Sequence, residues 1–501
     1  MAGTTATSDV ETDLAHLVNG SWLTPSTDET IDIVNPATEE VIAQVPVATP
    51  RDAELAITAA RTAFDEGPWP RMSGAERGKV LRQFADALWE HRETLVDIAV
   101  RQGGCTIGQA RGMQVYFPIQ QMYRYADLAE QEMVERTYIG GGSMSVGAGP
   151  SVGHSIVKRE PAGVVSAITP FNYPTLLNLQ KVGPALAAGC AVVLKPTEYI
   201  CRDAHEIARI ALEYTDLPPG VLNVLLGGKG DVGEMMSSHP MVDQVSFTGS
   251  THTGRRIMAS ASQTIKRVTL ELGGKSANIV FADADLEKVL QPDSALVIRH
   301  CGQGCGHWTR VLVEESLHDE LVERMVARAK TVVVGDPMDP ATEMGPLVNQ
   351  AQWERVKGYI ESGIDEGATL LAGGGRPAGI DLGYYLEPTV FDDTTSEMKI
   401  FQEEIFGPVV SVQSFTTEEE AVRLANDSIY GLNGAVWSGD LARGLRVANA
   451  VRTGSITVNG GGAEEAGLPY GGYKQSGLGR EFGEWGFNEY TELKTIKYVA
   501  N

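Results

Sequence analysis

One cysteine of the chain stands in a peptide that suits a nucleophile. Cys305 ends the sequence Gly302-Gln303-Gly304-Cys305, which follows an expected helical segment at 294–299 and precedes an expected strand. Glycines at such a break let backbone amides face inward, where they lower a thiol pKa and hold an oxyanion. A buried structural cysteine is an equally weighted alternative, because most lone cysteines are inert. The spacing alone leaves both interpretations open.

The residues around this cysteine also raise the question of a metal site. His300, Cys301, Cys305 and His307 place four soft ligands close together in the sequence. Ligands crowded this tightly are poorly spaced for tetrahedral zinc, and neither a CxxC nor an HxxxH pair is present. We therefore expect no metal site.

Two further polar residues have settings that suit catalysis. Glu271 lies between two leucines and before Gly273-Gly274-Lys275, which favours a buried base with a raised pKa. An exposed glutamate on a strand edge is the alternative. Asn172 follows an expected strand within a stiff aromatic-proline turn, so its amide is a candidate oxyanion donor, although such an Asn is usually only a turn residue.

Three peptides are candidates for holding a phosphate or a ribose. The sequence 228–233 matches GxGxxG after an expected strand, but no acidic residue closes a following strand, so the match is weak. Phe247-Thr248-Gly249-Ser250-Thr251 precedes an expected helix at 254–261, and helix N-termini bind phosphate. Lys195-Pro196-Thr197-Glu198 follows a strand where an adenosine ribose lies in a doubly wound sheet.

The elements that must position these residues alternate between strands and helices. A hairpin is expected at 31–47, amphipathic helices between 51 and 101, and a Gly/Ser-rich loop or extended arm at 140–153. Such alternation predicts right-handed βαβ units and parallel sheets. The expected strands form two series, at 163–169, 191–194, 221–226 and 244–247, and then at 277–281, 310–313, 369–372 and 455–458.

Composition sets limits on the function. The 501 residues carry 41 Lys and Arg against 65 Asp and Glu, a net charge of −24, which disfavours nucleic acid and anionic lipid as partners. Five cysteines are too few for a secreted disulfide framework, and the N-terminus has no signal pattern. No window approaches the length of a membrane span. We expect a cytoplasmic protein that is not embedded in a membrane.

The ordered set of motifs resembles the aldehyde dehydrogenase superfamily, whose members are NAD(P)-dependent and non-phosphorylating. The resemblance runs from Asn35-Pro36-Ala37-Thr38 to Tyr490-Thr491-Glu492. It includes ITPFNYP (168–174), LKPTE (194–198), FTGST (247–251), LELGGKS (270–276), GQGC (302–305), EEIFGP (403–408) and PYGGYKQSGLGRE (469–481).

The resemblance implies roles for the residues above. Cys305 would be the nucleophile, Glu271 the general base and Asn172 the oxyanion donor, with Lys181 as a further catalytic residue. The reaction would oxidise an aldehyde to the carboxylic acid through a thiohemiacetal and a thioester, with hydride transfer to NAD. The cofactor-binding residues would be Ile168, Thr169, Pro170, Lys195, Thr197, Glu198, Gly228, Gly233, Phe247, Gly249, Ser250, Leu272, Glu404 and Phe406.

Cofactor choice and substrate shape follow from the same resemblance. The charge of Glu198 would repel a 2′-phosphate and favour NAD, while Lys195 leaves NADP as an alternative. Glycines on either side of Cys305 would widen the substrate tunnel, whose polar mouth suits a bulky aldehyde with a polar far end. An ion pair of Arg299 with Glu464 or Glu465 that merely closes the mouth is an equally weighted alternative. The pocket would comprise Met113, Phe117, Tyr173, Arg299, Gly304, Gly306, Glu464, Glu465 and Tyr470.

The implied fold is α/β, with two doubly wound parallel-sheet domains and a small β oligomerisation arm. The Rossmann-like NAD-binding domain would comprise residues 1–130 and 159–272, the catalytic domain 273–473, and the arm 131–158 and 474–501. The arm, with a C-terminal strand at 491–499 pairing across a subunit interface, predicts a homodimer or homotetramer.

Two positions depart from the family pattern beside the nucleophile. His300 stands where relatives usually have Asn, and His307 stands where they usually have Ala. A catalytically silent structural or binding homologue is the alternative function, although the complete catalytic set favours an enzyme. An NAD reduction assay with a panel of aldehydes discriminates the two.

Overall fold

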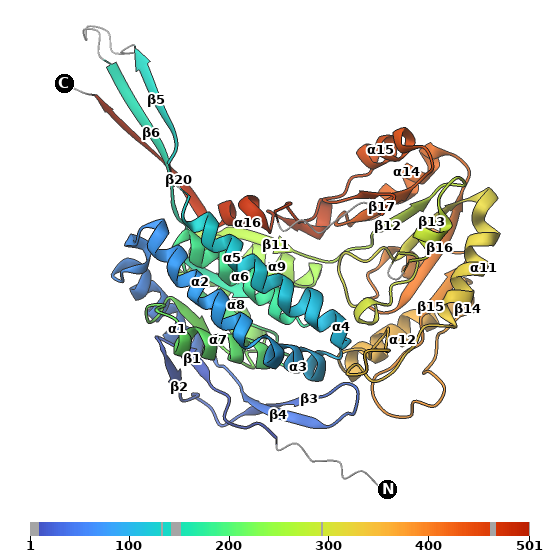
Figure 1. Cartoon of the computed structure of the whole chain (residues 1–501), viewed down its shortest axis with the longest axis horizontal. Coiled ribbons are helices and arrows are strands. Elements are labelled where there is room, and N and C mark those ends of the chain that lie inside the picture. The colour runs from blue at the N-terminus through green and yellow to red at the C-terminus, as the bar shows by residue number, and fades with distance from the viewer. Residues whose placement is uncertain (1–9, 132–133, 142–151, 292–293, 461–466, 500–501) are drawn as a thin grey trace.

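The computed structural model describes residues 10–131, 134–141, 152–291, 294–460 and 467–499. Two large sheets lie in different parts of the molecule, and a narrow three-stranded sheet projects away from both (Figure 1). The α/β class with two parallel-rich sheets is confirmed. No helix within these ranges is long and apolar enough to cross a bilayer.

The first sheet has eight strands in the order β19-β11-β10-β7-β8-β9-β1-β2. Its five central strands, β11 to β9, run parallel, and the outer strands are antiparallel to their neighbours. All residues of β7, β8 and β10 are buried, which explains the β-branched apolar residues of β7 and β8. The strands are β1 (His16–Val18), β2 (Ser21–Leu23), β7 (Val164–Ile168), β8 (Ala191–Lys195), β9 (Leu222–Val224), β10 (Gln244–Thr248), β11 (Arg267–Glu271) and β19 (Gly477–Leu478).

The second sheet has seven strands in the order β14-β15-β16-β13-β12-β17-β18. All neighbours are parallel except β14 and β15, so the strand expected at 369–372 is an antiparallel edge rather than a member of the parallel series. The strands are β12 (Ala277–Val280), β13 (Arg310–Glu314), β14 (Thr369–Ala372), β15 (Thr389–Asp392), β16 (Val409–Phe415), β17 (Gly434–Trp437) and β18 (Thr457–Val458).

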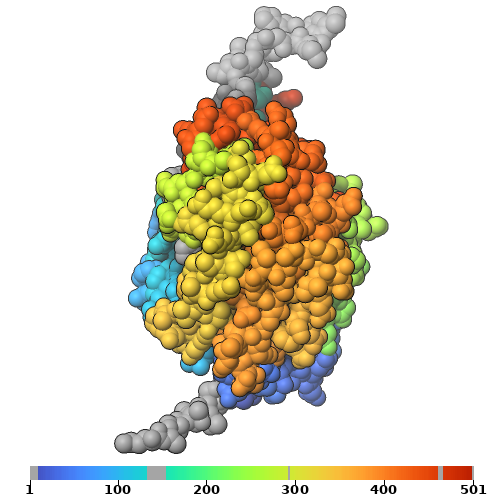
Figure 2. All heavy atoms as spheres, turned by 90° about the vertical axis from the view of Figure 1, so that its right-hand side faces the viewer, coloured from blue at the N-terminus to red at the C-terminus, as the bar shows by residue number. Residues whose placement is uncertain are grey.

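The helices flank both sheets. The longest are α1 (Pro50–Asp65), α2 (Gly74–Glu90), α6 (Pro174–Ala188) and α12 (Gln350–Asp365). The others are α3 (Arg92–Gly103), α4 (Ile107–Gln109), α5 (Phe117–Ala129), α7 (Arg202–Tyr214), α8 (Gly230–Ser238), α9 (Thr251–Ala261), α10 (Leu286–Val289), α11 (His318–Ala329), α13 (Lys399–Gln402), α14 (Glu418–Asn426), α15 (Leu441–Ala450) and α16 (Gly483–Glu489). Figure 2 shows the side of the molecule on which the yellow and orange segments, with α11 and α12 among them, form the surface.

Local sequence explains the first elements of the chain. Thr49 and Ser73 each close a capping box, with Asp52 and Glu76, at the starts of α1 and α2. The expected break between these helices is a short 3₁₀ turn at Trp69–Arg71. The expected hairpin is present as β3 (Thr30–Val34) paired antiparallel with β4 (Val41–Pro46).

A projecting sheet is built from β5 (Val134–Gly141), β6 (Val152–Pro161) and β20 (Thr491–Val499). β20 pairs with β6 of its own chain along its whole length, and β6 pairs with β5. Most of the Gly/Ser-rich segment expected at 140–153 lies outside the described residues. β20 is an edge strand in the described part of the sheet, and its Leu493, Ile496 and Tyr498 are exposed.

The helix expected at 294–299 does not form, although the structure describes all of these residues. This segment is irregular, and Arg299–Gly302 forms a 3₁₀ turn. All four side chains from Ala295 to Ile298 are buried, so the segment has no solvent face. Asn278 Nδ2 donates to the Ser294 carbonyl at 2.6 Å, which replaces the hydrogen bond that a helix would supply. The apolar run indicated burial and was wrongly interpreted as helix.

Candidate active site

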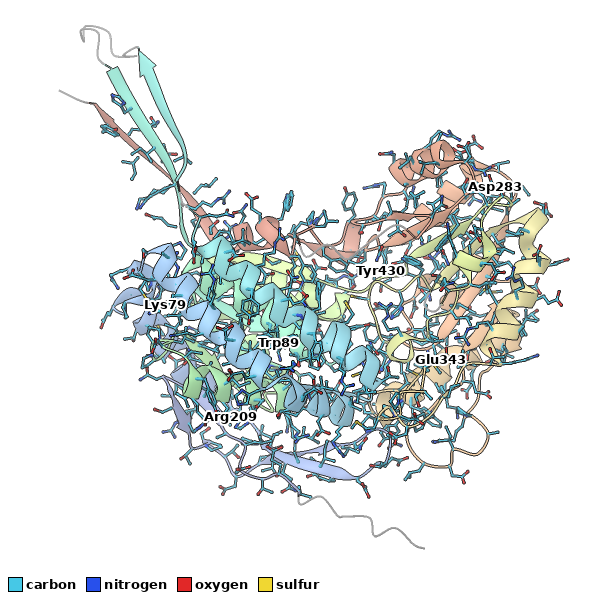
Figure 3. All side chains as sticks on the ribbon, in the orientation of Figure 1. Lys79, Trp89, Arg209, Asp283, Glu343 and Tyr430 are labelled. Atoms are coloured by element: carbon cyan, nitrogen blue, oxygen red, sulfur yellow. The ribbon has the colours of Figure 1, made fainter. Side chains whose placement is uncertain are left out.

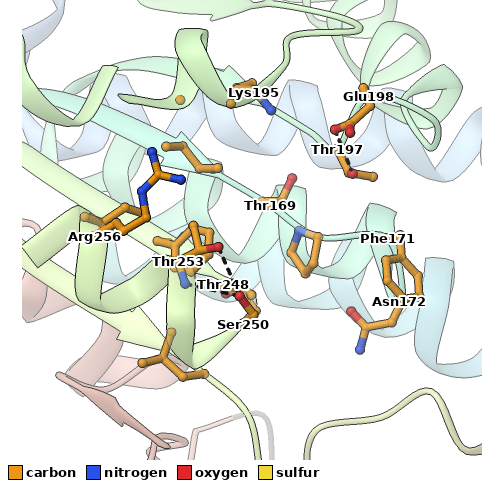
Figure 4. A pocket seen from close by; sticks show the side chains of 18 of the residues that line it. Thr169, Phe171, Asn172, Lys195, Thr197, Glu198, Thr248, Ser250, Thr253 and Arg256 are labelled. Atoms are coloured by element: carbon orange, nitrogen blue, oxygen red, sulfur yellow. Dashed lines mark hydrogen bonds between the residues drawn. The ribbon is translucent and has the colours of Figure 1, made fainter. Parts of the chain in front are cut away.

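A cavity of about 540 Å³ opens at the carboxyl ends of the central strands of the first sheet (Figure 4). Ligands of doubly wound sheets bind at this edge. Every predicted cofactor residue except Gly228 lines the cavity. Both Asn172 and Cys305 line it as well, so the predicted cofactor residues and two of the predicted catalytic residues share one cavity.

One end of the cavity holds the residues predicted to bind a ribose. Thr197 Oγ1 donates to Glu198 Oε2 at 3.3 Å, and Figure 4 shows both side chains with Lys195 on the same wall. Burial lowers the pKa of Lys195, while the Glu198 carboxylate opposes this shift. A cation and an acceptor carboxylate at one site can bind vicinal hydroxyls.

The cavity also receives the start of α9. Ser250 caps this helix and accepts from the Thr253 amide at 3.2 Å, so free amides of the first turn face the cavity. A Cβ on Gly249 would lie 2.4 Å from the Phe247 ring, so glycine is required here. The buried Thr248 Oγ1 has no hydrogen-bond partner in the structure. This arrangement fits an anionic group such as a pyrophosphate.

The GxGxxG peptide borders the cavity along part of its length. Lys229 precedes α8, and Gly230 and Gly233 line the cavity. Gly228 faces Lys195 instead, because a Cβ there would lie 3.0 Å from Lys195 Cε. The peptide is therefore a wall of the cavity rather than its phosphate cradle.

Glu404 and Phe406 reach the cavity from the second sheet's side of the molecule. Glu404 Oε1 accepts from the Gly274 amide at 2.9 Å, and burial raises the pKa of Glu404 to about 7. A side chain at Gly273 would collide with Glu404 and with Tyr430, which Figure 3 labels between the two parts of the ribbon. The Gly-Gly turn thus lets Glu404 approach the end of β11.

The loop before Cys305 is held from both sides. His300 and Cys301 have φ of 49° and 52°, and Gly302 continues this left-handed path. The buried Gln303 donates through Nε2 to the His300 carbonyl at 3.0 Å and accepts through Oε1 from the Val348 amide at 3.0 Å. A Cβ on Gly274 would lie 2.1 Å from the Cys305 carbonyl oxygen. The two glycine-containing motifs therefore pack against each other and bring the candidate nucleophile beside the end of β11.

The Cys305 thiol contacts the Tyr470 hydroxyl, with Sγ and Oη 3.6 Å apart. Burial raises the pKa of Cys305 to about 12, and the Tyr470 hydrogen bond acts in the opposite direction. The sequence predicted that inward-facing amides lower this pKa. A backbone hydrogen bond does lower it, but loss of hydration on burial is the larger effect, so the net shift of the Cys305 pKa is upward.

Glu271 ends β11 and is 2% exposed. Neither carboxylate oxygen has a hydrogen-bond partner in the structure. Burial raises its pKa well above the usual range, the Glu481 charge adds to this, and Lys181 and Arg480 oppose it. A carboxylate whose pKa is raised takes up a proton more readily than an ordinary glutamate, which suits a general base.

Lys181 and Glu481 form a fully buried ion pair behind Glu271. Lys181 Nζ lies 2.6 Å from Glu481 Oε1 and donates to Ser246 Oγ at 3.2 Å. Gln180 Nε2 also donates to Glu481. The sequence predicted Lys181 but missed Glu481, although this residue ends the quoted PYGGYKQSGLGRE motif.

Asn172 is 3% exposed and lines the cavity together with Cys305. Its backbone carbonyl accepts from Gln114 Nε2 at 2.9 Å, and its Oδ1 has no partner in the structure. Figure 4 shows its side chain beyond Phe171 at one end of the cavity. A fixed backbone with a side-chain amide directed at the cavity is what an oxyanion donor requires.

The predicted substrate residues are partly aromatic and partly beyond the described ranges. The Tyr470 ring packs on Phe482, which packs on Phe117, at centroid distances of 6.2 and 5.8 Å. Tyr173 packs on His300 at 5.7 Å. Met113 lies in the π-helical segment Ala110–Tyr116, and Arg299 begins the 3₁₀ turn. Glu464 and Glu465 lie outside the described residues.

The prediction that two glycines widen the tunnel is not supported by the packing. A Cβ on Gly304 would lie 2.2 Å from His307 Cδ2, so the His307 ring fills that space. A Cβ on Gly306 would lie 3.0 Å from Tyr470 Oη and 3.3 Å from Asn433 Nδ2. Larger neighbouring side chains occupy the room that the glycines leave.

Other cavity residues had no signal in the sequence analysis. Glu234 and Arg256 line the cavity from α8 and α9, and Gln352 and Arg355 line it from α12. Within the described ranges, no three His, Cys, Asp or Glu side chains are grouped to hold a metal ion.

Comparison with known proteins places this geometry in context. The family described as "Aldehyde dehydrogenase family" matches residues 22–496. Betaine aldehyde dehydrogenase of Bacillus subtilis is 40% identical over 481 residues, which are 96% of each chain. Aminoaldehyde dehydrogenase 2 of Zea mays is 41% identical over 490 residues, covering 97% of this chain and 95% of the relative. A structure of betaine aldehyde dehydrogenase from Staphylococcus aureus with NAD⁺ has a TM-score of 0.91 and 39% identity, covering 97% and 94% of the two chains.

Proposed function

The chain belongs to the aldehyde dehydrogenase family and is an oxidoreductase, and on this premise we propose that it oxidises an aldehyde to the carboxylic acid through a thioester on Cys305. The observation that supports this most directly is the shared cavity. Its lining includes Asn172, Cys305 and the residues suited to a dinucleotide, while the buried Glu271 lies behind it. A catalytically silent homologue is thereby set aside.

The cofactor of this enzyme family is NAD(P), and solved relatives carry NAD⁺. The residues of this chain fit such a group, because the α9 amides, the required Gly249 and the unpartnered Thr248 hydroxyl suit its phosphates. We propose that Lys195 and Glu198 hold the adenosine ribose, and that Glu404 and Phe406 hold the nicotinamide ribose. When bound, the nicotinamide supplies the hydride acceptor that no side chain provides.

The first half-reaction depends on Cys305 and Asn172. The thiolate attacks the aldehyde carbon, and a C–S bond forms as the carbonyl oxygen becomes an oxyanion. The Asn172 amide and the Cys305 backbone N–H donate to this oxygen. Loss of one such donor costs about 10²–10³-fold in rate. Oxidation of the thiohemiacetal leaves a thioester on Cys305.

The second half-reaction depends on Glu271. Once ionised, its carboxylate takes a proton from a water molecule, which attacks the thioester and releases the acid and the Cys305 thiolate. We propose that Lys181 acts through Glu481, whose charge faces Glu271.

The proposed substrate is an aldehyde with an ammonium group at its far end. The names of the relatives, betaine aldehyde and aminoaldehyde dehydrogenases, favour this class. The rings of Phe117, Tyr470 and Phe482 supply faces on which a cation is stabilised. The polar far end expected from the sequence agrees with this class.

Assembly, domain boundaries and compartment are also proposals. The exposed edge of β20 suits pairing with a second copy, so we propose a homodimer or homotetramer in the cytoplasm. The domains are proposed at 1–130 with 159–272, at 273–473, and at 131–158 with 474–501. Sedimentation at micromolar concentration tests the assembly, and a monomer would contradict it.

The proposed reaction is tested with Cys305→Ser and with Cys301→Ser as the matched control. Cys301 is buried and is four residues away. Cys305→Ser should abolish NAD reduction with aminoaldehydes, betaine aldehyde and aliphatic aldehydes, whereas Cys301→Ser should retain it. Retained turnover in Cys305→Ser would exclude the thioester. Equal kcat/KM for cationic and neutral aldehydes of the same size would exclude the ammonium preference.

A further inference from the structure

Tyr470 places a phenolic hydroxyl against the sulfur that is proposed to react. Its Oη lies 3.6 Å from Cys305 Sγ, and this is the side-chain contact that the structure gives for the thiol. Two carboxyls, Glu404 and Glu271, also act on Cys305, and both disfavour a thiolate. Of these three side chains, Tyr470 is the one that stabilises a thiolate on Cys305.

The hydroxyl is held in place by structure remote from the substrate. The Tyr470 amide donates to the Glu481 carbonyl at 2.9 Å, and the Glu481 amide donates to the Tyr470 carbonyl at 2.7 Å. The Glu481 side chain is anchored by its buried ion pair with Lys181. The Tyr470 ring packs edge-on against Phe482. A hydroxyl fixed in this way loses little freedom when it donates to an anion.

We propose that Tyr470 is a catalytic residue whose hydroxyl donates a hydrogen bond to the Cys305 thiolate before it attacks the aldehyde. The proposal rests on Cys305 being the nucleophile. A hydroxide ion or water molecule from the solvent takes the thiol proton, the S–H electron pair stays on sulfur, and the Tyr470 O–H points to the resulting lone pair. When the C–S bond forms, sulfur becomes neutral and the hydrogen bond weakens. The tyrosine keeps its own proton throughout.

The protonation states agree with this assignment. Burial, together with Cys305 and Glu271, raises the pKa of Tyr470 well above its usual range, so the phenol remains a donor at working pH. A thiol ordinarily ionises before a phenol. The hydroxyl is therefore the donor and the sulfur the acceptor once a proton has left the pair.

The test is the rate of Cys305 alkylation by iodoacetamide across neutral and alkaline pH. The other four cysteines are buried, and Cys305→Ser identifies any signal from them. Tyr470→Phe removes only the hydroxyl and should raise the thiol pKa by about one unit. A pKa one unit higher leaves about tenfold less thiolate below the pKa, but each thiolate is about threefold more nucleophilic. The variant should therefore react about threefold more slowly at pH values where the rate still rises with pH. It should react about threefold faster at pH values where the thiol is fully ionised and the rate levels off.

The direction of the effect separates catalysis from packing. Removing an atom that shields the sulfur would, on steric grounds alone, speed alkylation at every pH. Tyr470→Leu also lacks the hydroxyl and should show the same slowing, although it loses ring packing on Phe482. Tyr473→Phe, at an exposed tyrosine of the same segment, should match the wild-type enzyme.

Three outcomes would overturn the proposal. In the pH range where the wild-type alkylation rate rises, Tyr470→Phe could react as fast as the wild-type enzyme or faster, or Tyr470→Leu could show no slowing. The third outcome is that Tyr473→Phe is slowed as much as Tyr470→Phe. Absence of alkylation at Cys305 in the wild-type enzyme would instead contradict the proposed nucleophile, so the two failures are distinguishable.

Discussion

Tyr470 and Glu481 exchange two backbone hydrogen bonds, at 2.9 and 2.7 Å, and their side chains serve the two halves of the site. The Tyr470 hydroxyl contacts the Cys305 sulfur, and the Glu481 charge acts on Glu271. The pair therefore links the groups proposed for acylation and for hydrolysis through one rigid backbone bridge. Because Glu481 is fixed by the buried Lys181, the bridge is anchored in the first sheet's helix layer.

Glu271→Gln should separate the two half-reactions. A burst of reduced cofactor equal to the number of active sites should remain, because the thioester still forms. Steady-state turnover should fall by about 10²–10⁴-fold, because water is no longer deprotonated. Stopped-flow absorbance measures both phases. Glu484→Gln, at an exposed glutamate nearby, is the control and should change neither phase. Loss of the burst in Glu271→Gln would contradict this role.

The pH dependence of turnover follows from the raised pKa of Glu271. Because this pKa is raised, the carboxyl still ionises at pH values where an ordinary glutamate is already charged, and hydrolysis of the thioester should accelerate as it does so. Steady-state rates at saturating aldehyde should therefore keep increasing at pH values above the usual range of a glutamate pKa. A hydrolysis rate that falls over this range would contradict a Glu271 base.

Removing the lysine of the buried ion pair should destabilise the fold. Lys181→Met leaves the Glu481 carboxylate buried without its cation, which costs about 3–5 kcal/mol in the free energy of unfolding. Urea denaturation measures this loss. The double variant Lys181→Met/Glu481→Gln should recover most of it. Lys288→Met breaks an exposed pair with Asp285 and should cost less than about 1 kcal/mol. Equal losses for both lysines would refute the argument.

Gly304→Ala should impair small and large aldehydes alike. The new Cβ would lie 2.2 Å from His307 Cδ2 and would displace that ring beside the nucleophile loop, at a cost of about 1–3 kcal/mol. His307→Ala in the same chain should restore much of kcat/KM. Gly358→Ala, whose Cβ meets nothing within 4 Å, is the control. A loss confined to bulky aldehydes would instead favour an open tunnel at Gly304.

Glu198→Gln should shift cofactor choice toward NADP. The carboxylate lies beside Lys195 on the ribose wall of the cavity, and its charge repels a 2′-phosphate. We expect the ratio of kcat/KM for NADP to that for NAD to rise about tenfold, as for the loss of one like-charge contact. Glu234→Gln removes another carboxylate of the same cavity, one already paired with Arg256, and should change this ratio less. An unchanged ratio in Glu198→Gln would show that the charge does not select NAD.

Sequence alone determined the fold class and the main chemical groups. The β-branched runs at β7 and β8 predict buried parallel strands, because the composition and period of a run are local properties of the sequence. The glycines beside Cys305 and Glu271 likewise predict a close approach of two backbones, because such an approach leaves no room for a Cβ.

Tertiary structure alone decided which distant residues meet. Glu481 joins Lys181 across 300 positions of sequence, and Tyr470 joins Cys305 across 165. No periodicity encodes such pairs, because they arise where separately formed elements pack together. Burial decided the raised pKa of Cys305, and the His307 ring decided the space beside Gly304. Both depend on what surrounds a residue in three dimensions, which its neighbours in the chain do not specify.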